Sequence, residues 1–489
     1  MKTAGWLLPV ILTLTGCATS GTGQHHAQTL SQALISVGAA PALAGASTGM
    51  IVRDANSGKV LYQTHSDLRM VPASNMKLLT SVAAFGILGP DYRFDTRLLT
   101  NGTQRGDKLN GDIYLQGSGD PTLQPADLDA FAASLAQRGI RQIHGRLLLD
   151  DSAFDSVPFG QGWSWDDELF AFAAPISALN YTVDPEGDIN VVRVEVRPGA
   201  SKTSPAVISV YPATNAVTLI NNTTTGDATA LSVNRRAGSN QIVVSGTIAA
   251  KGETYSRQIT VDDPTQMVGA LLYAALKEHG ITVRGDIGKA APPANAEVLA
   301  SKISAPLSEL AVTFLKLSNN SYGEILTKAM GRQAQGKGDW ESGLQTLHKY
   351  LQQQGINTDA LRQVDGSGLS RMNQVTPEQL AAVLLVARKQ PWFNAWHNAL
   401  PVAGVPALMV GGTLRNRMIN TPAAGRAYAK TGSLTGVSSI SGYVDSATGR
   451  PLVFSMISNN YLVPGAQIKA LEDKMVVTLA SCDASVVCH

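Results

Sequence analysis

The sequence has almost no net charge, few cysteines and no long run of either charge sign. Lys and Arg number 39 against 37 Asp and Glu, a formal net charge of +2 at pH 7. No basic tract indicates a nucleic-acid partner, and no acidic or low-complexity run indicates disorder. We also find no internal repeat. With 44% apolar residues in 489, the chain is typical of a globular protein with two or more domains.

Metal chemistry has no support in the sequence. The chain has 3 cysteines and 8 scattered histidines, without Cys-x-x-Cys or His-Glu-x-x-His. We therefore expect neither a metal site nor a cofactor. Cys482 and Cys488 stand near the C-terminus, and in an oxidising compartment they could form a disulfide, which the sequence leaves open.

The N-terminus predicts targeting. Lys2 precedes an apolar run from Trp6 to Leu14, which is too short to span a bilayer, and Leu-Thr-Gly-Cys follows, ending at Cys17. That tetrad resembles a bacterial lipoprotein box, so residues 1–17 would be a signal with Cys17 lipidated, and residues 18–30 a tether. Ala18 resembles the signal for the outer membrane of a Gram-negative cell. The alternative is a plain cleaved signal.

Three motifs occur in a fixed order along the chain. Residues 74–77 read Ser-Asn-Met-Lys, residues 318–320 read Ser-Asn-Asn, and residues 430–432 read Lys-Thr-Gly. Ser-x-x-Lys alone is expected about once by chance in a chain of this length, but the ordered set is far rarer. Together they are the parts of a serine acyl-transfer site that works without histidine.

The surroundings of each motif suit such a site. Ser74 opens an apolar helical pattern that places Lys77 on the same face, where burial would favour the neutral lysine that can accept a proton. Ser318 and Asn320 precede a helix that Ser321 and Glu324 would cap as a Ser-x-x-Glu box. Residues 430–432 lead into strand patterns at 437–444 and 452–457. A ligand could lie close against Gly432, which lacks a side chain. The alternatives are that Ser74 caps the helix beside an ordinary surface Lys77, that Ser318 and Asn320 only satisfy backbone groups in their turn, and that Lys430 is an exposed lysine of a strand.

Three further stretches carry a family resemblance. Residues 116–123 (QGSGDPTL), 174–180 (APISALN) and 365–371 (DGSGLSR) resemble segments of the D-alanyl-D-alanine carboxypeptidase/endopeptidases, low-molecular-mass penicillin-binding proteins with a long insertion. The resemblance runs from about residue 46 to 480. It implies periplasmic hydrolysis of peptidoglycan stem peptides and crosslinks, and binding of β-lactam antibiotics. It says nothing of oligomeric state.

The resemblance also implies roles for the motif residues. Ser74 would be acylated, Lys77 would be its general base, and Ser318 with Lys430 would pass a proton to the departing D-alanine. Asn320 would bind the substrate amide, and the backbone N–H groups of Ser74 and Ser433 would form the oxyanion hole. Thr431 and Ser433 would hold the terminal carboxylate.

A segment from residue 162 to 172 resembles the family's grip on a diaminopimelate side chain. Asp167, with Phe172 five residues later, would hold the ammonium group, and Arg371 would hold the carboxylate. The alternative is that Asp167 caps a turn and Arg371 makes a structural ion pair.

The resemblance and the strand patterns together predict an α+β fold. A discontinuous catalytic domain, an antiparallel sheet flanked by helices, would comprise residues 31–95 and 291–489. An inserted α/β domain would comprise residues 96–180 and 256–290, and residues 181–255 would form a β-rich domain nested in it.

Other functions fit less well. Residues 45–49 (Gly-Ala-Ser-Thr-Gly) match the nucleophile elbow of α/β-hydrolases, but a strand pattern follows where a helix is required. A β-lactamase shares the three motifs but would not be expected to carry so long an insertion. A non-catalytic cell-wall-binding lipoprotein of the same fold is disfavoured because Ser74, Lys77 and Lys430 are intact.

Overall fold

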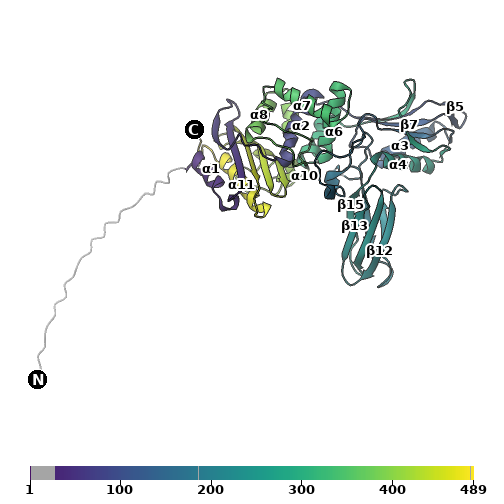
Figure 1. The fold of residues 1–489 in the computed structure, drawn as a ribbon, viewed down its shortest axis with the longest axis horizontal. Helices are drawn as coiled ribbons and strands as arrows, with labels where there is room; N and C mark the ends of the chain where they lie inside the picture. Colours follow the sequence, from purple (N-terminus) through teal and green to yellow (C-terminus); the bar gives the residue numbers. More distant parts are fainter. Residues whose placement is uncertain (2–27, 185–186, 485, 489) are drawn as a thin grey trace.

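The computed structural model describes residues 1, 28–184, 187–484 and 486–488. The predicted lipidation site Cys17 and the tether up to residue 27 lie outside them. Among the described residues, no helix is long and apolar enough to cross a membrane. Figure 1 shows a main body of sheet and helices, an inserted part beside it, and a β-rich arm that projects from the inserted part.

The main body is built on an antiparallel five-stranded sheet in the order β19-β20-β21-β2-β3. Its strands are β2 (Ser47–Asp54), β3 (Val60–Thr64), β19 (Ala427–Leu434), β20 (Val437–Asp445) and β21 (Pro451–Asn459). β2 and β3 form an antiparallel hairpin, and β2 pairs with β21 from the far end of the chain. The main body is therefore formed by both ends of the sequence.

Helices cover both faces of this sheet. Alternate residues of β21 enter different cores, with Phe454 and Met456 on one face and Val453 and Ile457 on the other. On the first face lie α1 (Leu30–Gly38) and α11 (Gly465–Ala480). On the second face lie α2 (Met76–Ile87), α5 (Leu307–Lys316), α6 (Asn320–Gln335), α7 (Trp340–Gln353), α8 (Pro377–Arg388) and α9 (Phe393–Asn398).

The inserted part contains a second five-stranded sheet in the order β17-β9-β7-β4-β18, packed against α3 (Pro125–Gln137) and α4 (Pro264–Glu278). Its strands are β4 (Asp95–Thr100), β7 (Ile113–Gly117), β9 (Leu147–Asp150), β17 (Ile287–Lys289) and β18 (Glu297–Ile303). A small sheet adds β5 (Thr103–Arg105), β6 (Lys108–Asn110), β8 (Gln142–Ile143) and β16 (Thr282–Val283).

The β-rich arm consists of two three-stranded sheets, β11-β10-β15 and β12-β14-β13. Its strands are β10 (Val191–Arg197), β11 (Val207–Tyr211), β12 (Thr218–Gly226), β13 (Ala230–Arg235), β14 (Gln241–Ala249) and β15 (Tyr255–Thr260).

Two strands lie beyond the domain boundaries expected from the sequence. β15 pairs with β10, so the arm continues to Thr260 rather than ending at residue 255. β18, which we assigned to the catalytic domain, pairs with β4 of the inserted sheet. Strand pairing joins segments distant in sequence, and local patterns do not show which sheet an edge strand joins.

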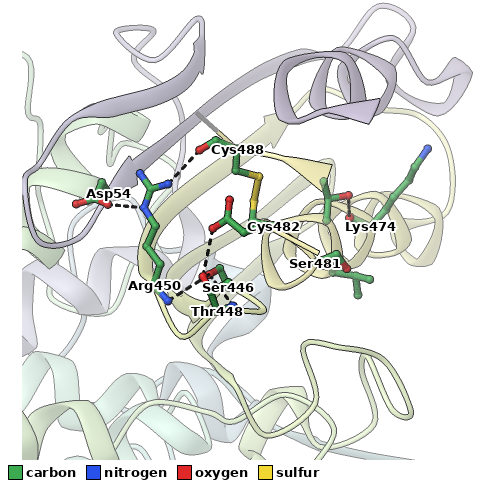
Figure 2. The surroundings of a disulfide bond; sticks show 11 residues. Asp54, Ser446, Thr448, Arg450, Lys474, Ser481, Cys482 and Cys488 are labelled. Atoms are coloured by element: carbon green, nitrogen blue, oxygen red, sulfur yellow. Dashed lines mark hydrogen bonds and ion pairs between the residues drawn. A yellow bond between two sulfur atoms is a disulfide. The ribbon is translucent and has the colours of Figure 1, made fainter. Parts of the chain in front are cut away.

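The C-terminus is fastened to the main body. Cys482 and Cys488 form a disulfide with their Cα atoms 5.5 Å apart, which answers the question left open above. Figure 2 shows Arg450 beside this bond, donating to Asp54 Oδ2 (2.7 Å) and to the Cys488 carbonyl (3.0 Å). The bond and the arginine together tie the chain end to the sheet.

Candidate active site

The start of α2 presents the first motif. Ser74 lies in a 3-10 turn (Ala73–Asn75) that runs directly into α2, and Lys77, one turn further on, is fully buried. Lys77 Nζ lies 2.9 Å from Ser74 Oγ, 2.6 Å from Asn320 Oδ1 and 2.8 Å from the Ser367 carbonyl. An ammonium group donates to all three. A neutral amine keeps two of these bonds and accepts the Ser74 hydroxyl proton with its lone pair.

Burial changes the acid–base state of this lysine. Removal from water lowers the pKa of Lys77 to about 7, against the opposing effect of the Glu324 and Asp365 carboxylates. A substantial fraction of Lys77 is then neutral near pH 7, whereas an ordinary lysine is almost wholly protonated there. The geometry and the charge state both suit a general base for Ser74.

The second and third motifs meet beside the first. Lys430 Nζ on β19 donates to Ser318 Oγ (2.8 Å) and to the Thr431 carbonyl (2.7 Å). Burial and the nearby Lys77 hold the pKa of Lys430 well below its ordinary value. Ser318 has a left-handed backbone (φ 61°), which non-glycine residues adopt at a cost and which is frequent at functional sites. Asn320 is the first residue of α6.

β19 is an edge strand, and its Lys-Thr-Gly-Ser segment (430–433) lies against the turn that carries Ser74. A Cβ atom on Gly432 would lie 2.6 Å from the Pro72 carbonyl and 3.0 Å from the Ser74 nitrogen. Gly432 thus lets the strand approach the backbone of Ser74, a different reason from the ligand contact expected above. Thr431 Oγ1 lies 2.8 Å from Thr413 Oγ1, and Ser433 is exposed.

Glu324 is a buried carboxylate and does not belong to the cap of α6 as the sequence predicted. The N-cap of α6 is Asn319, whose side chain accepts from the Tyr322 N–H, so the predicted Ser-x-x-Glu capping box is wrong. Glu324 is fully buried and accepts from the N–H groups of Gly366 and Ser367, both at 2.8 Å. Ser-x-x-Glu is satisfied equally by a cap and by a buried carboxylate, so no local signal separated the two.

The residues predicted to bind the diaminopimelate side chain lie on two segments, with Asp167 and Phe172 on one and Arg371 on the other. Phe172 accepts from Asn320 Nδ2 through its carbonyl (2.8 Å), and its ring stacks on Phe170. Arg371 donates to the Thr435 carbonyl (2.7 Å). Burial and the neighbouring Asp166 raise the pKa of Asp167, while Arg371 lowers it, so Asp167 and Arg371 lie within electrostatic reach of each other.

Two other expectations concern alternative chemistry. Ser47 of the Gly-x-Ser-x-Gly match is the first residue of β2, and no helix follows it, so it is not a nucleophile elbow. Within the described ranges, no group of three or more His, Cys, Asp or Glu side chains could hold a metal ion.

Known proteins resemble this chain both in sequence and in structure. Residues 30–482 match the D-Ala-D-Ala carboxypeptidase 3 (S13) family. The chain is 41% identical to a D-alanyl-D-alanine carboxypeptidase of Actinomadura sp., over 90% of this chain and 82% of that one. The structure matches the crystal structure of penicillin binding protein 4 (dacB) from Haemophilus influenzae with a TM-score of 0.80 and 27% identity, covering 91% of this chain and 98% of that one. A complex of that protein with a β-lactam matches with a TM-score of 0.74 and 25% identity, covering 90% and 97%.

Proposed function

The chain belongs to the D-Ala-D-Ala carboxypeptidase 3 (S13) family and is a serine-type D-Ala-D-Ala carboxypeptidase, and we propose that it works through an acyl-enzyme on Ser74. The observation that carries the proposal is the placement of Lys77 Nζ, 2.9 Å from Ser74 Oγ, with a pKa of about 7. A buried lysine in contact with a serine is the arrangement that activates a nucleophile without histidine.

In the proposed reaction, Ser74 Oγ attacks the carbonyl carbon between the two D-alanines, and Lys77 takes the hydroxyl proton. The N–H groups of Ser74 and Ser433 stabilise the oxyanion. The proton that Lys77 has taken passes by way of Ser318 and Lys430 to the departing amine, so the C–N bond breaks, D-alanine leaves and Lys77 is neutral again. Water then hydrolyses the ester and restores the Ser74 hydroxyl.

Binding of the substrate is assigned to the groups around this centre. Asn320 binds the peptide amide, and Thr431 and Ser433 bind the terminal carboxylate, with Gly432 keeping β19 close. Asp167, Phe172 and Arg371 hold the diaminopimelate side chain of the stem peptide. A crosslink between stems is also an amide of a D-alanine carbonyl, with a side-chain amine in place of the terminal D-alanine, so we include endopeptidase action in the proposal.

β-Lactams and location complete the proposal. A β-lactam amide mimics the D-alanyl-D-alanine bond, and the related Haemophilus protein has been crystallised with a β-lactam. The Cys482–Cys488 disulfide favours an oxidising compartment. We place the enzyme in the periplasm, anchored to the outer membrane through lipid on Cys17.

Labelling with fluorescent penicillin tests the nucleophile. The wild-type protein should form a stable adduct whose mass maps to the peptide containing Ser74, and Ser74→Ala should abolish labelling. Ser47→Ala is the matched control, because Ser47 belongs to the rival motif and should label normally. An adduct on a peptide without Ser74 would refute the assignment.

A further inference from the structure

The loop of residues 365–371 is held by two buried carboxylates. Asp365, at its start, accepts from the N–H groups of Gly368 (2.8 Å) and Ser370 (2.7 Å) and from the Trp163 indole (3.1 Å). Glu324, on α6, accepts from Gly366 and Ser367 and from the Trp340 indole (2.7 Å). Both carboxyl groups are fully buried, and among the described residues no cationic side chain forms an ion pair with either of them. Burial and the neighbouring Asp365 raise the pKa of Glu324 to about 7, and burial raises the pKa of Asp365, while the hydrogen-bond donors around each group lower it.

The loop passes these contacts on to α2. The Ser367 N–H points to Glu324 while the Gly366 carbonyl, in the same peptide unit, accepts from Thr80 Oγ1 (2.7 Å). In the next unit the Gly368 N–H points to Asp365 while the Ser367 carbonyl accepts from Lys77 Nζ (2.8 Å). Two successive peptide units therefore each join a carboxylate to α2, and a hydrogen bond at one end of a peptide unit strengthens the bond at the other.

The close contact of the loop with α6 depends on small residues. A Cβ on Gly366 would lie 2.3 Å from the Gly323 carbonyl, so only glycine lets the loop reach Glu324. This packing fixes the position of the Ser367 carbonyl oxygen. That oxygen accepts from Lys77 Nζ, so it also fixes Lys77 Nζ between Ser74 and Asn320.

We propose that Glu324 and Asp365 are a positioning pair for acyl transfer, which aims Lys77 at Ser74 through the Ser367 carbonyl and whose negative charge stabilises the ammonium that Lys77 becomes on taking the Ser74 proton. The proposal rests on Lys77 being the base. Transfer of the proton creates a positive charge on the fully buried Lys77, where the negative charge that the two carboxyl groups share has its greatest effect. Neither carboxylate touches the substrate.

The test is the pH dependence of penicillin acylation in Glu324→Gln, which removes the charge and places an amide NH2 among hydrogen-bond donors. We expect the maximal rate to fall about tenfold or more. Because the lost charge no longer favours protonated Lys77, the pH at which the acylation rate reaches half of its maximum should also fall, by about one unit. We call this pH the midpoint. A merely structural role would lower the rate without moving the midpoint in this direction, and that result would overturn the proposal.

Two further variants protect the test against misfolding. Trp340→Phe removes only the indole donor to Glu324 and keeps a ring beside Lys328. That donor lowers the pKa of Glu324, so its loss leaves Glu324 less charged and should shift the midpoint of the acylation profile in the same direction by less. Glu472→Gln removes another fully buried carboxylate, bonded to Arg417 and Ser438, and should lose stability with an unchanged midpoint. If Glu324→Gln does not fold, a wild-type midpoint in Trp340→Phe overturns the assignment.

Lys77→Arg in the same assay separates this proposal from the one it rests on. Normal acylation by Lys77→Arg would remove Lys77 as the base. Slow acylation by Lys77→Arg with a normal profile for Glu324→Gln would leave the base in place and reject the positioning pair alone.

Discussion

Asp167→Ala should separate peptide hydrolysis from penicillin acylation. Asp167 lies at the end of a 3-10 turn (Trp165–Asp167) of the inserted part, on the segment that reaches Asn320 through the Phe172 carbonyl. In the proposed clamp, its carboxylate binds the free ammonium group of the diaminopimelate side chain, and Arg371 binds the carboxylate of that side chain. Penicillin has no such side chain and should not depend on either.

The size of the effect follows from the exposure of the site. A charge-assisted hydrogen bond contributes about 1.5–3 kcal/mol, and partial exposure to water places Asp167 at the lower end of that range. About 1.4 kcal/mol corresponds to a tenfold change. We therefore expect kcat/KM for D-alanine release from a diaminopimelate pentapeptide to fall about tenfold, with the penicillin acylation rate nearly unchanged.

Asp166→Ala is the matched control, since Asp166 lies in the same turn, is exposed and carries the same charge. D-alanine release would be followed by a coupled assay and acylation by stopped-flow fluorescence with labelled penicillin. If both rates fell together in Asp167→Ala, the residue would be supporting the fold or the catalytic centre. If Asp166→Ala cost as much peptide activity, only the net charge of the turn would matter and the clamp would be wrong.

Two further predictions concern the catalytic centre. Acylation needs neutral Lys77, so its rate should rise with pH through about 7 and then level off, and a rate that does not change between pH 5 and 9 would contradict Lys77 as the base. Lys77→Arg should slow acylation by at least about a hundredfold, because an arginine cannot give up its proton usefully. Gly432→Ala should slow acylation by about a hundredfold or more, because the new methyl group overlaps the Pro72 carbonyl and forces β19 away from Ser74. Gly288→Ala on β17 is its control, and equal rates in the two variants would show that the close approach of β19 is not needed.

The sequence predicted the motif residues of the site better than the residues whose hydrogen bonds hold the site together. Ser74, Lys77, Ser318 and Lys430 belong to short motifs whose order indicates one site, and the structure brings them within hydrogen-bond distance of one another in pairs. Their catalytic roles stay predictions. Glu324 was missed because its contacts are with residues 366 and 367, more than forty positions away, and a helix pattern carries no trace of them.

The boundaries of the inserted part failed for a related reason. The alternating pattern of residues 255–260 predicts a strand, but only its pairing with β10 shows that it belongs to the arm. β18 joins β4 across about two hundred residues. A local pattern gives the type of an element, whereas its neighbours are fixed by contacts that form only in the folded chain.

The 365–371 loop joins the two proposals, because Ser367 contacts the base and Arg371, four residues later, belongs to the proposed clamp. Glu324 and Asp365 hold the backbone between them, so a change at Glu324 should disturb both ends of the loop. Loss of Asp167, in the 3-10 turn Trp165–Asp167, should disturb only the binding of the side chain of the peptide substrate. The ratio of peptide hydrolysis to penicillin acylation therefore distinguishes the proposed clamp from the positioning pair. This ratio should fall about tenfold in Asp167→Ala. In Glu324→Gln both rates should fall, because Lys77 is displaced. A Glu324→Gln enzyme that lost only peptide activity would place Glu324 in the clamp and not behind the base.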